Sequence, residues 1–95
     1  MTLLLLPSRF RTGSIVKSPR AVAELSQADM LAAFIRRIQG DWGELDQFDW
    51  QVNDDALEYG GRLASQYRDV HGTWFLIITE RDRSVTKILL PGEAL

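Results

Sequence analysis

The last third of the chain most constrains the fold, because it contains three consecutive segments that resemble β-strands. They cover residues 62–68, 74–79 and 85–90, and β-branched or aromatic residues dominate the second and third. Gly72 in the first connection can adopt positive φ, which is typical of a tight hairpin. The pattern therefore predicts a C-terminal three-stranded meander.

The middle segment is apolar on both faces. Successive side chains of a strand point in opposite directions, so Trp74, Leu76 and Ile78 share one face and Phe75, Ile77 and Thr79 the other. A strand buried on both faces is expected at the centre of a sheet, with helices on one face. The other face then needs a cover, either the N-terminal leucines or a second copy of the chain in a homodimer.

Helical spacing marks two segments before the meander. Ser26 is the expected N-cap of a helix over residues 26–39, which leaves Arg36 and Arg37 to solvent. Asp46 is the expected N-cap of a second helix, and Gly60 ends it. Residues three or four apart predict its buried face, formed by Leu45, Phe48, Val52, Ala56 and Tyr59. The expected core combines both helices with the central strand through Phe34, Ile38, Leu57, Leu76 and Ile78.

The chain of 95 residues has the length of one domain. We predict an apolar N-terminal arm over residues 1–12 and a single α+β domain over residues 13–95, with two main helices packed on a small antiparallel sheet. A brief strand over 13–17 and a short helix over 20–25 open that domain. The leucines at positions 3–6 are too few for a secretory signal or a transmembrane helix, so we expect a cytoplasmic protein away from membranes. The arm packs either on the body or on a partner.

The segment 41–50 is the most acidic and aromatic part of the chain. In one interpretation its carboxylates cap a helix and Trp42 fills the corner between two helices. In the other interpretation the segment is a docking face for a basic partner. The candidate residues of that face are Asp41, Trp42, Glu44, Asp46, Asp49 and Trp50. Trp50 lies off the predicted buried stripe, which favours a partly exposed side chain.

The loop over residues 80–84 alternates in charge. Such a loop is either a solvated turn or a place where Arg81 or Arg83 contacts a phosphate or carboxylate. These two arginines are the second candidate patch for a partner.

Catalytic patterns are missing from the sequence. It has no cysteine, its one histidine, His71, falls in the hairpin tip, and it lacks glycine-rich phosphate loops and zinc spacings. We therefore expect no cofactor, no metal and no enzyme activity. A net charge of −2 gives the whole chain no bulk attraction to nucleic acid.

Several phrases of the sequence resemble a family of small, largely uncharacterised bacterial proteins found on plasmids and other mobile elements. The most specific are Gly40-Asp41-Trp42-Gly43 and Ile78-Thr79-Glu80-x-Asp82-Arg83-Ser84, and the opening Gly13-x-Ile15-Val16-x-Ser18-Pro19 also fits. The chain departs from that family at its leucine-rich start, at Trp50, at Arg81 and over its last five residues. The resemblance implies no catalytic residues.

Two functional classes follow. The first is a non-enzymatic protein from a mobile element that binds a host or mobile-element protein, such as a nucleic-acid-binding defence complex, and inhibits it in the manner of an anti-CRISPR or anti-restriction protein. The second is a toxin similar to RelE or ParE, which the order of strand, helices and meander allows; those toxins act on messenger RNA or gyrase and tend to be basic. A dimer that regulates plasmid functions is a third interpretation.

Overall fold

The computed structural model describes residues 8–93, so the leucines predicted to form the arm lie outside the described residues. Two of its three helices are long. The elements, in chain order, are β1 (Ser14–Lys17), α1 (Pro19–Glu24), α2 (Gln27–Ile38), α3 (Gln47–Tyr59), β2 (Leu63–Arg68), β3 (Trp74–Thr79) and β4 (Val85–Leu89).

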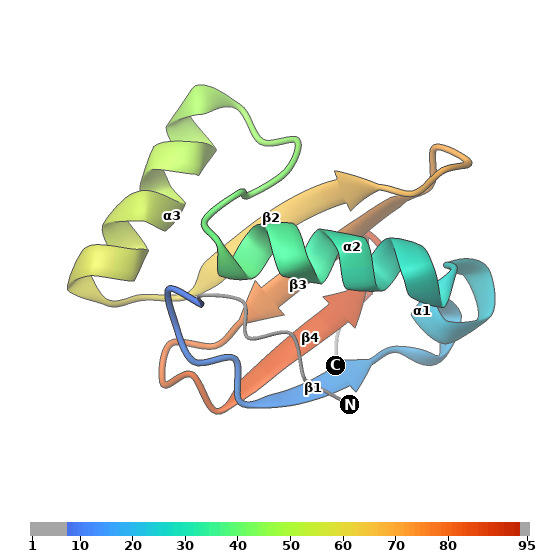
Figure 1. The fold of residues 1–95 in the computed structure, drawn as a ribbon, viewed down its shortest axis with the longest axis horizontal. Helices are drawn as coiled ribbons and strands as arrows, with labels where there is room; N and C mark the ends of the chain where they lie inside the picture. The colour runs from blue at the N-terminus through green and yellow to red at the C-terminus, as the bar shows by residue number, and fades with distance from the viewer. Residues whose placement is uncertain (1–7, 94–95) are drawn as a thin grey trace, which may run out of the picture.

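The strands form one four-stranded sheet in the order β1-β4-β3-β2 (Figure 1). β2, β3 and β4 are the predicted antiparallel meander, whereas β1 pairs with β4 in parallel, so the sheet is mixed rather than antiparallel throughout. The predicted α+β architecture and the central position of β3 are confirmed.

A polar side chain caps the N-terminus of each helix, and two of these caps, Ser26 and Asp46, are the predicted ones. The Ser18, Ser26 and Asp46 side chains accept hydrogen bonds from the backbone N–H three residues later, as N-caps do. Gly40 has φ of 89° immediately after the C-terminus of α2, a conformation that residues with a Cβ rarely adopt. Local signals therefore set the helix boundaries.

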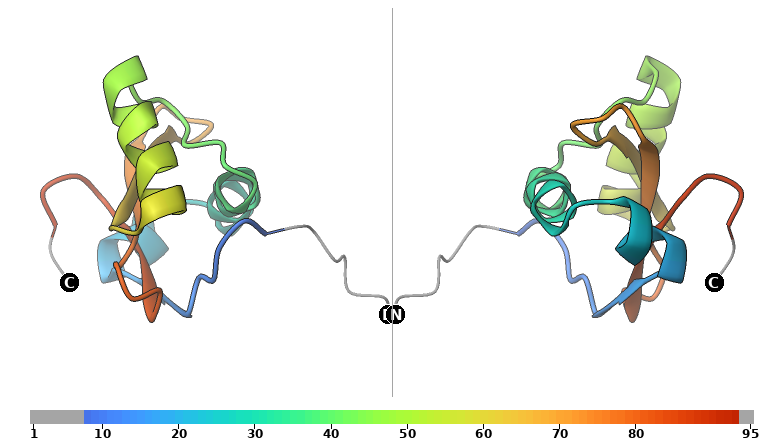
Figure 2. Two further views of the ribbon diagram at one scale, coloured as in Figure 1. Left: turned by 90° about the vertical axis from the view of Figure 1, so that its left-hand side faces the viewer. Right: turned by 90° about the vertical axis from the view of Figure 1, so that its right-hand side faces the viewer.

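α2 crosses one face of the sheet, and the end views show it standing clear of the strands on that side (Figures 1 and 2). The sheet residues that face it include Tyr67, Phe75, Ile77 and Ile88, which belong to the main apolar cluster. α1 and α2 close this cluster through Ala21, Leu25, Met30 and Ala33. The core is thus built on the face of β3 that carries Phe75 and Ile77.

The prediction of a single core is wrong, because its five residues do not form one cluster. They are Phe34, Ile38, Leu57, Leu76 and Ile78. Leu76 and Ile78 alternate with the buried Phe75 and Ile77, so they point to the sheet face opposite α2. A second cluster holds Trp42, Ala56 and Leu63, and partly buried side chains packed against it include Leu57. The two-residue period identifies the two faces of a strand, but it does not specify which face a helix covers.

Arg37 is fully buried, which corrects the prediction that it lies in solvent with Arg36. Its Nε donates to Ser65 Oγ at 2.7 Å, its Nη1 to Thr79 Oγ1 at 2.6 Å and its Nη2 to the Leu63 carbonyl at 2.9 Å. These acceptors lie on the face of β2 and β3 beneath α2. A long cationic side chain is accommodated there because all three acceptors converge on the guanidinium.

Aromatic rings flank the same guanidinium. Its central carbon lies 5.4 Å from the centroid of Phe10 and 5.9 Å from that of Trp42. Burial lowers the pKa of Arg37 to about 10. Arg37 remains a cation at neutral pH, and Phe10 ties the segment before β1 to the body of the domain.

The β2 edge of the sheet is closed by groups from outside the sheet. Asn53 of α3 donates to the Ala64 carbonyl and accepts from the Ala64 N–H, both at 2.8 Å, as a neighbouring strand would. Two residues further along β2, the Gln66 carbonyl accepts a hydrogen bond from Glu44 N at 2.7 Å. α3 is therefore fixed on β2 by backbone recognition as well as by apolar packing.

Candidate functional site

The predicted docking segment 41–50 is largely occupied by internal contacts. Arg36 binds both oxygens of Asp41, at 2.8 and 3.2 Å, and Asp41 also accepts from Gly43 N at 3.0 Å. The hydrogen bond from Arg36 holds the pKa of Asp41 below its usual value. The charge of Asp41 is compensated within the domain.

Glu44 is compensated in the same way. Arg68 contacts its two carboxylate oxygens at 2.8 and 2.7 Å, and this hydrogen bonding lowers the pKa of Glu44. The Arg68 guanidinium also lies 4.8 Å from the centre of the Trp74 ring. Asp41 and Glu44 thus form local ion pairs at the surface, where such pairs contribute little free energy.

The other two carboxylates of the segment lie at the start of α3. Asp46 is the N-cap and accepts from Asp49 N at 2.7 Å. Asp49 is exposed in the first turn, where a negative charge complements the helix dipole. Both carry out the capping role that one interpretation of the sequence predicts, and Asp49 keeps its carboxylate at the surface.

The two tryptophans of this segment pack toward the domain, Trp42 completely and Trp50 in part. Trp42 is fully buried, and its Nε1 donates to Asp54 Oδ1 at 2.9 Å. Trp50 is partly buried and packs against the cluster that contains Trp42. Trp42 therefore has no surface with which to contact a partner, and it fills the corner between helices.

Arg83 has a structural contact in place of the predicted anion contact. Its backbone is left-handed, with φ of 62°, and its Nη1 donates to the carbonyls of Gly61 at 2.6 Å and Glu80 at 3.2 Å. Its Nη2 donates to the Ala56 carbonyl at 3.2 Å, near the C-terminus of α3. Arg81 is exposed, and its side chain has no hydrogen bond or ion pair within residues 8–93.

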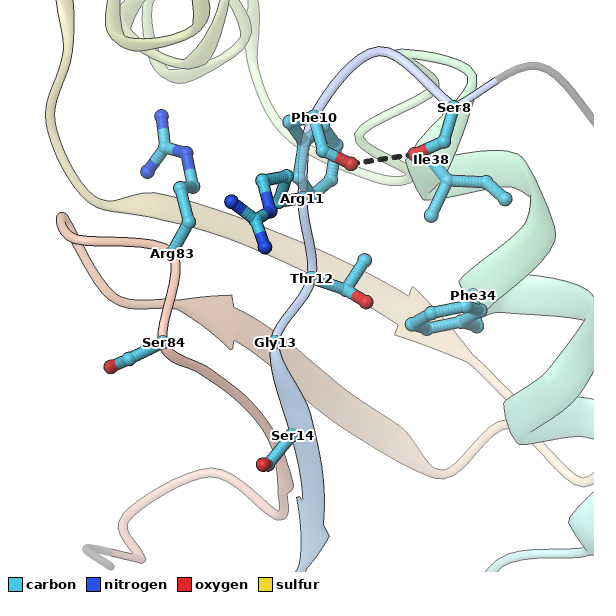
Figure 3. Close-up of a pocket in the computed structure, with 10 residues that line it drawn as sticks. All are labelled: Ser8, Phe10, Arg11, Thr12, Gly13, Ser14, Phe34, Ile38, Arg83 and Ser84. Carbon is cyan, nitrogen blue, oxygen red and sulfur yellow. Dashed lines mark hydrogen bonds between the residues drawn. The ribbon is translucent and has the colours of Figure 1, made fainter.

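Beside Arg83, a hollow of about 680 Å³ lies between the segment before β1 and α2. Figure 3 shows Arg11 and Arg83 on one side of it and Phe34 and Ile38 on the other. Arg11 is exposed, and its guanidinium has no partner in the described part of the chain. Among the described residues that line this hollow, Arg11 is the one whose charge has no partner.

The outer face of α3 is the surface that the sequence analysis missed. Phe48, Val52 and Tyr59 are 75%, 47% and 78% exposed, although their spacing predicted a buried stripe. The helix instead buries Asn53 and Ala56 and turns Trp50 toward the second cluster. We use "outer face of α3" for Phe48, Val52, Asp55 and Tyr59, which are spaced four, three and four residues apart.

The sequence contains a signal for this arrangement. Trp50, Asn53 and Leu57 are also spaced by three or four residues, so α3 has apolar residues on two faces. The face that carries Trp50 and Asn53 packs against the rest of the domain, because tryptophan is the largest side chain and Asn53 pairs with β2. The second stripe is left at the surface together with acidic neighbours.

Acidic residues dominate the surface of α3. Its sequence contains four of them, Asp49, Asp54, Asp55 and Glu58, and no basic residue. A groove of about 290 Å³ continues from Val52 and Asp49 past Arg62 to Leu76 on the sheet. The outer face of α3 is therefore an apolar strip within a negative surface, next to a shallow recess.

No cluster of three His, Asp or Glu side chains suited to a metal ion occurs between residues 8 and 93. His71 is exposed at the hairpin tip, where its backbone N–H donates to Asp69 Oδ1. Across the same residues no helix has the length and apolar character needed to cross a membrane.

Comparison with known proteins adds no relative. No family model, no curated protein and no solved structure matches this chain. The candidate site therefore depends on the geometry of the domain alone.

Proposed function

We propose that this protein is a non-enzymatic protein-binding module whose partner contacts the outer face of α3. The observation that carries the proposal is the exposure of Phe48, Val52 and Tyr59 in a row on one helix. Exposed apolar side chains that share one face of a helix are candidates for an interaction site, and aromatic residues are enriched among those that contribute most to binding.

The charge around this strip indicates the kind of partner. Asp49, Asp55 and Glu58 are exposed beside it, and α3 supplies no cation to balance them. A complementary partner is positively charged around an apolar recess. Two copies of α3 face to face would bring like charges together, so the proposal favours a different protein over self-association through this helix.

The partner class that we propose is a nucleic-acid-binding protein of a host defence system, such as a CRISPR effector or a restriction enzyme. A basic channel that binds nucleic acid has the charge that α3 complements. The sequence resemblance to mobile-element proteins motivates the choice of defence proteins. In this proposal the protein acts in the cytoplasm and inhibits by occupying the channel.

Of the residues predicted from sequence, Asp46 and Asp49 remain in the proposed interface, at the N-terminal end of the strip. Asp41 and Glu44 lie outside it because arginines of the same domain compensate them. The contribution of Arg81 stays a prediction.

The test measures binding of the full chain to a panel of purified CRISPR effectors and restriction enzymes. We expect at least one member to bind, and more weakly at higher salt. Central aromatic residues contribute about 2 kcal/mol or more each, so each single variant, Phe48→Ser or Tyr59→Ser, should weaken binding about 30-fold. The double variant should weaken it about 1,000-fold if the two effects add. The control is the double variant Val22→Ser, Val70→Ser. These two apolar side chains are 61% and 76% exposed and lie outside α3.

Charge reversal at Asp49 and Asp55 should also weaken binding and flatten the salt dependence. Binding that is insensitive to both pairs of substitutions would overturn the proposed interface. Failure to bind any member of the panel would overturn the partner class. Growth arrest with cleaved messenger RNA that depends on Arg81 would favour the RelE-like or ParE-like alternative instead.

A further inference from the structure

The two edges of the sheet differ in how they are closed. β2 is covered by Asn53 and by the loop that contains Glu44, whereas β1 has no neighbour on its outer side among residues 8–93. Ser14 N donates to the Ser84 carbonyl and Ser18 N to the Ile88 carbonyl, both at 3.0 Å.

These two bonds fix the orientation of β1. In a parallel pair alternate residues of one strand direct both backbone groups at the neighbour. Since Ser14 and Ser18 point toward β4, Ile15 and Lys17 direct their N–H and C=O groups outward. β1 is thus an open edge with the hydrogen-bonding pattern that an additional strand requires.

An apolar groove of about 630 Å³ lies next to this edge, between β1 and α2. Ile15 forms one wall, Leu31 and Phe34 of α2 form the other, and Met30 and Ile88 contribute to the lining. Ile15 and Leu31 are 48% and 57% exposed, so both walls present unfilled apolar surface. A groove between an edge strand and a helix is a geometry in which extended peptides bind by strand addition.

We propose that the groove binds the leucines at positions 3–6 of the same chain, as a short strand antiparallel to β1. Residues 1–7 lie outside the described residues, and Ser8 lines the hollow that shares Phe34 with this groove. Arg9 N donates to the Ile38 carbonyl at 2.8 Å, which anchors the chain at the C-terminal end of α2. The segment before Ser8 therefore approaches the groove from that end.

The length of the segment fits the groove. Eleven steps along α2, from Ile38 back to Gln27, span about 16 Å at 1.5 Å per residue. Seven extended residues span about 23 Å. In this arrangement the added strand, followed from residue 1 to Ser8, runs opposite to β1. The two strands are therefore antiparallel.

The chemistry also fits. In an extended run of four leucines two side chains face the groove and two face away, and the groove offers isoleucine, leucine and phenylalanine surface. Pro7 lacks an N–H, which suits the point where the added strand ends and the anchored segment begins. Covalent attachment keeps the effective concentration of the leucines high, which favours this occupant over a free peptide.

The test uses the absence of cysteine in the chain. A nitroxide on Thr2→Cys in the full chain should broaden the amide signals of Lys17 and Ala28, at the far end of the groove. A nitroxide on Gln51→Cys, which is exposed on α3, should leave them sharp. In the labelled Thr2→Cys chain, Leu31→Asp should abolish the broadening at Lys17 and Ala28.

Two further measurements separate the alternatives. If a strand forms, only one of the alternating pairs, Leu3→Ser with Leu5→Ser or Leu4→Ser with Leu6→Ser, should strongly reduce the broadening. Equal effects of the two pairs, or broadening confined to residues near Ser8, would overturn the proposal. So would broadening of an unlabelled ¹⁵N chain mixed with the nitroxide chain, because the occupant would then come from a second copy.

Discussion

Asn53 provides the most direct test of how α3 is fixed on the sheet. Its side chain is 4% exposed and forms three hydrogen bonds, two with the Ala64 backbone at 2.8 Å and one with the Asp49 carbonyl at 3.1 Å. We predict that Asn53→Ala strongly destabilises the domain, because the edge of β2 loses its partner.

The magnitude follows from the two Ala64 bonds. Each contributes about 1 kcal/mol net, and a buried partner left without a bond adds a further penalty of about 1–3 kcal/mol. Ala64 itself is exposed, so water can satisfy part of what is lost. The expected decrease in the free energy of unfolding is about 2–3 kcal/mol, a large share of the 5–15 kcal/mol typical of a domain.

Urea unfolding followed by tryptophan fluorescence measures this decrease. Gln51→Ala is the matched control, since Gln51 is an exposed amide on the same helix that bonds to Asp55; it should change the free energy by about 0.5 kcal/mol or less. Asn53→Asp should be destabilising at neutral pH, and its difference from wild type should shrink in acid, where a protonated carboxyl can again donate to the Ala64 carbonyl. Equal stabilities of Asn53→Ala and Gln51→Ala would refute the reasoning.

Two other substitutions test the interior. Arg37→Ala should lower the free energy of unfolding by about 3–5 kcal/mol, because it removes a buried side chain with three acceptors. Arg36→Ala, at the surface, should lower it by about 1 kcal/mol or less. Similar unfolding midpoints for the two variants would contradict the buried position of Arg37. Burial raises the pKa of Tyr67 from 10.0 to about 12, and its hydroxyl donates to the Asp41 carbonyl. The protonated phenol therefore stabilises the fold fully below pH 10, and about 2–3 kcal/mol is lost as the pH rises through 12. Unfolding measured between pH 9 and 12 should show this additional loss in wild type, and its persistence in Tyr67→Phe would exclude Tyr67 as the cause.

Part of the architecture could be predicted from local patterns. Ser18, Ser26 and Asp46 mark helix starts because their side chains bond backbone groups only three residues away. The run from Trp74 to Thr79 indicates a central strand because both of its faces are apolar. These signals depend on neighbours in the sequence, so one sequence is enough to read them.

The candidate site could not be predicted in this way. The sequence analysis left Trp42 open between a buried corner and a docking face, and it placed Phe48 and Tyr59 in the interior. The structure buries Trp42 and leaves Phe48 and Tyr59 at the surface. Helical spacing shows which side chains share a face, and α3 has two faces with apolar residues. The choice between them depends on Asn53, which matches the free edge of β2.

The sequence by itself determined where the elements begin and end and which of them form the meander, because those properties arise from backbone capping and from side-chain alternation. The tertiary structure alone decided which faces are covered. Arg37 is buried because Ser65, Thr79 and the Leu63 carbonyl converge on its guanidinium from two strands. These residues are far apart in the sequence and are not regularly spaced, so no sequence pattern indicates that they meet. Only the packed domain shows it.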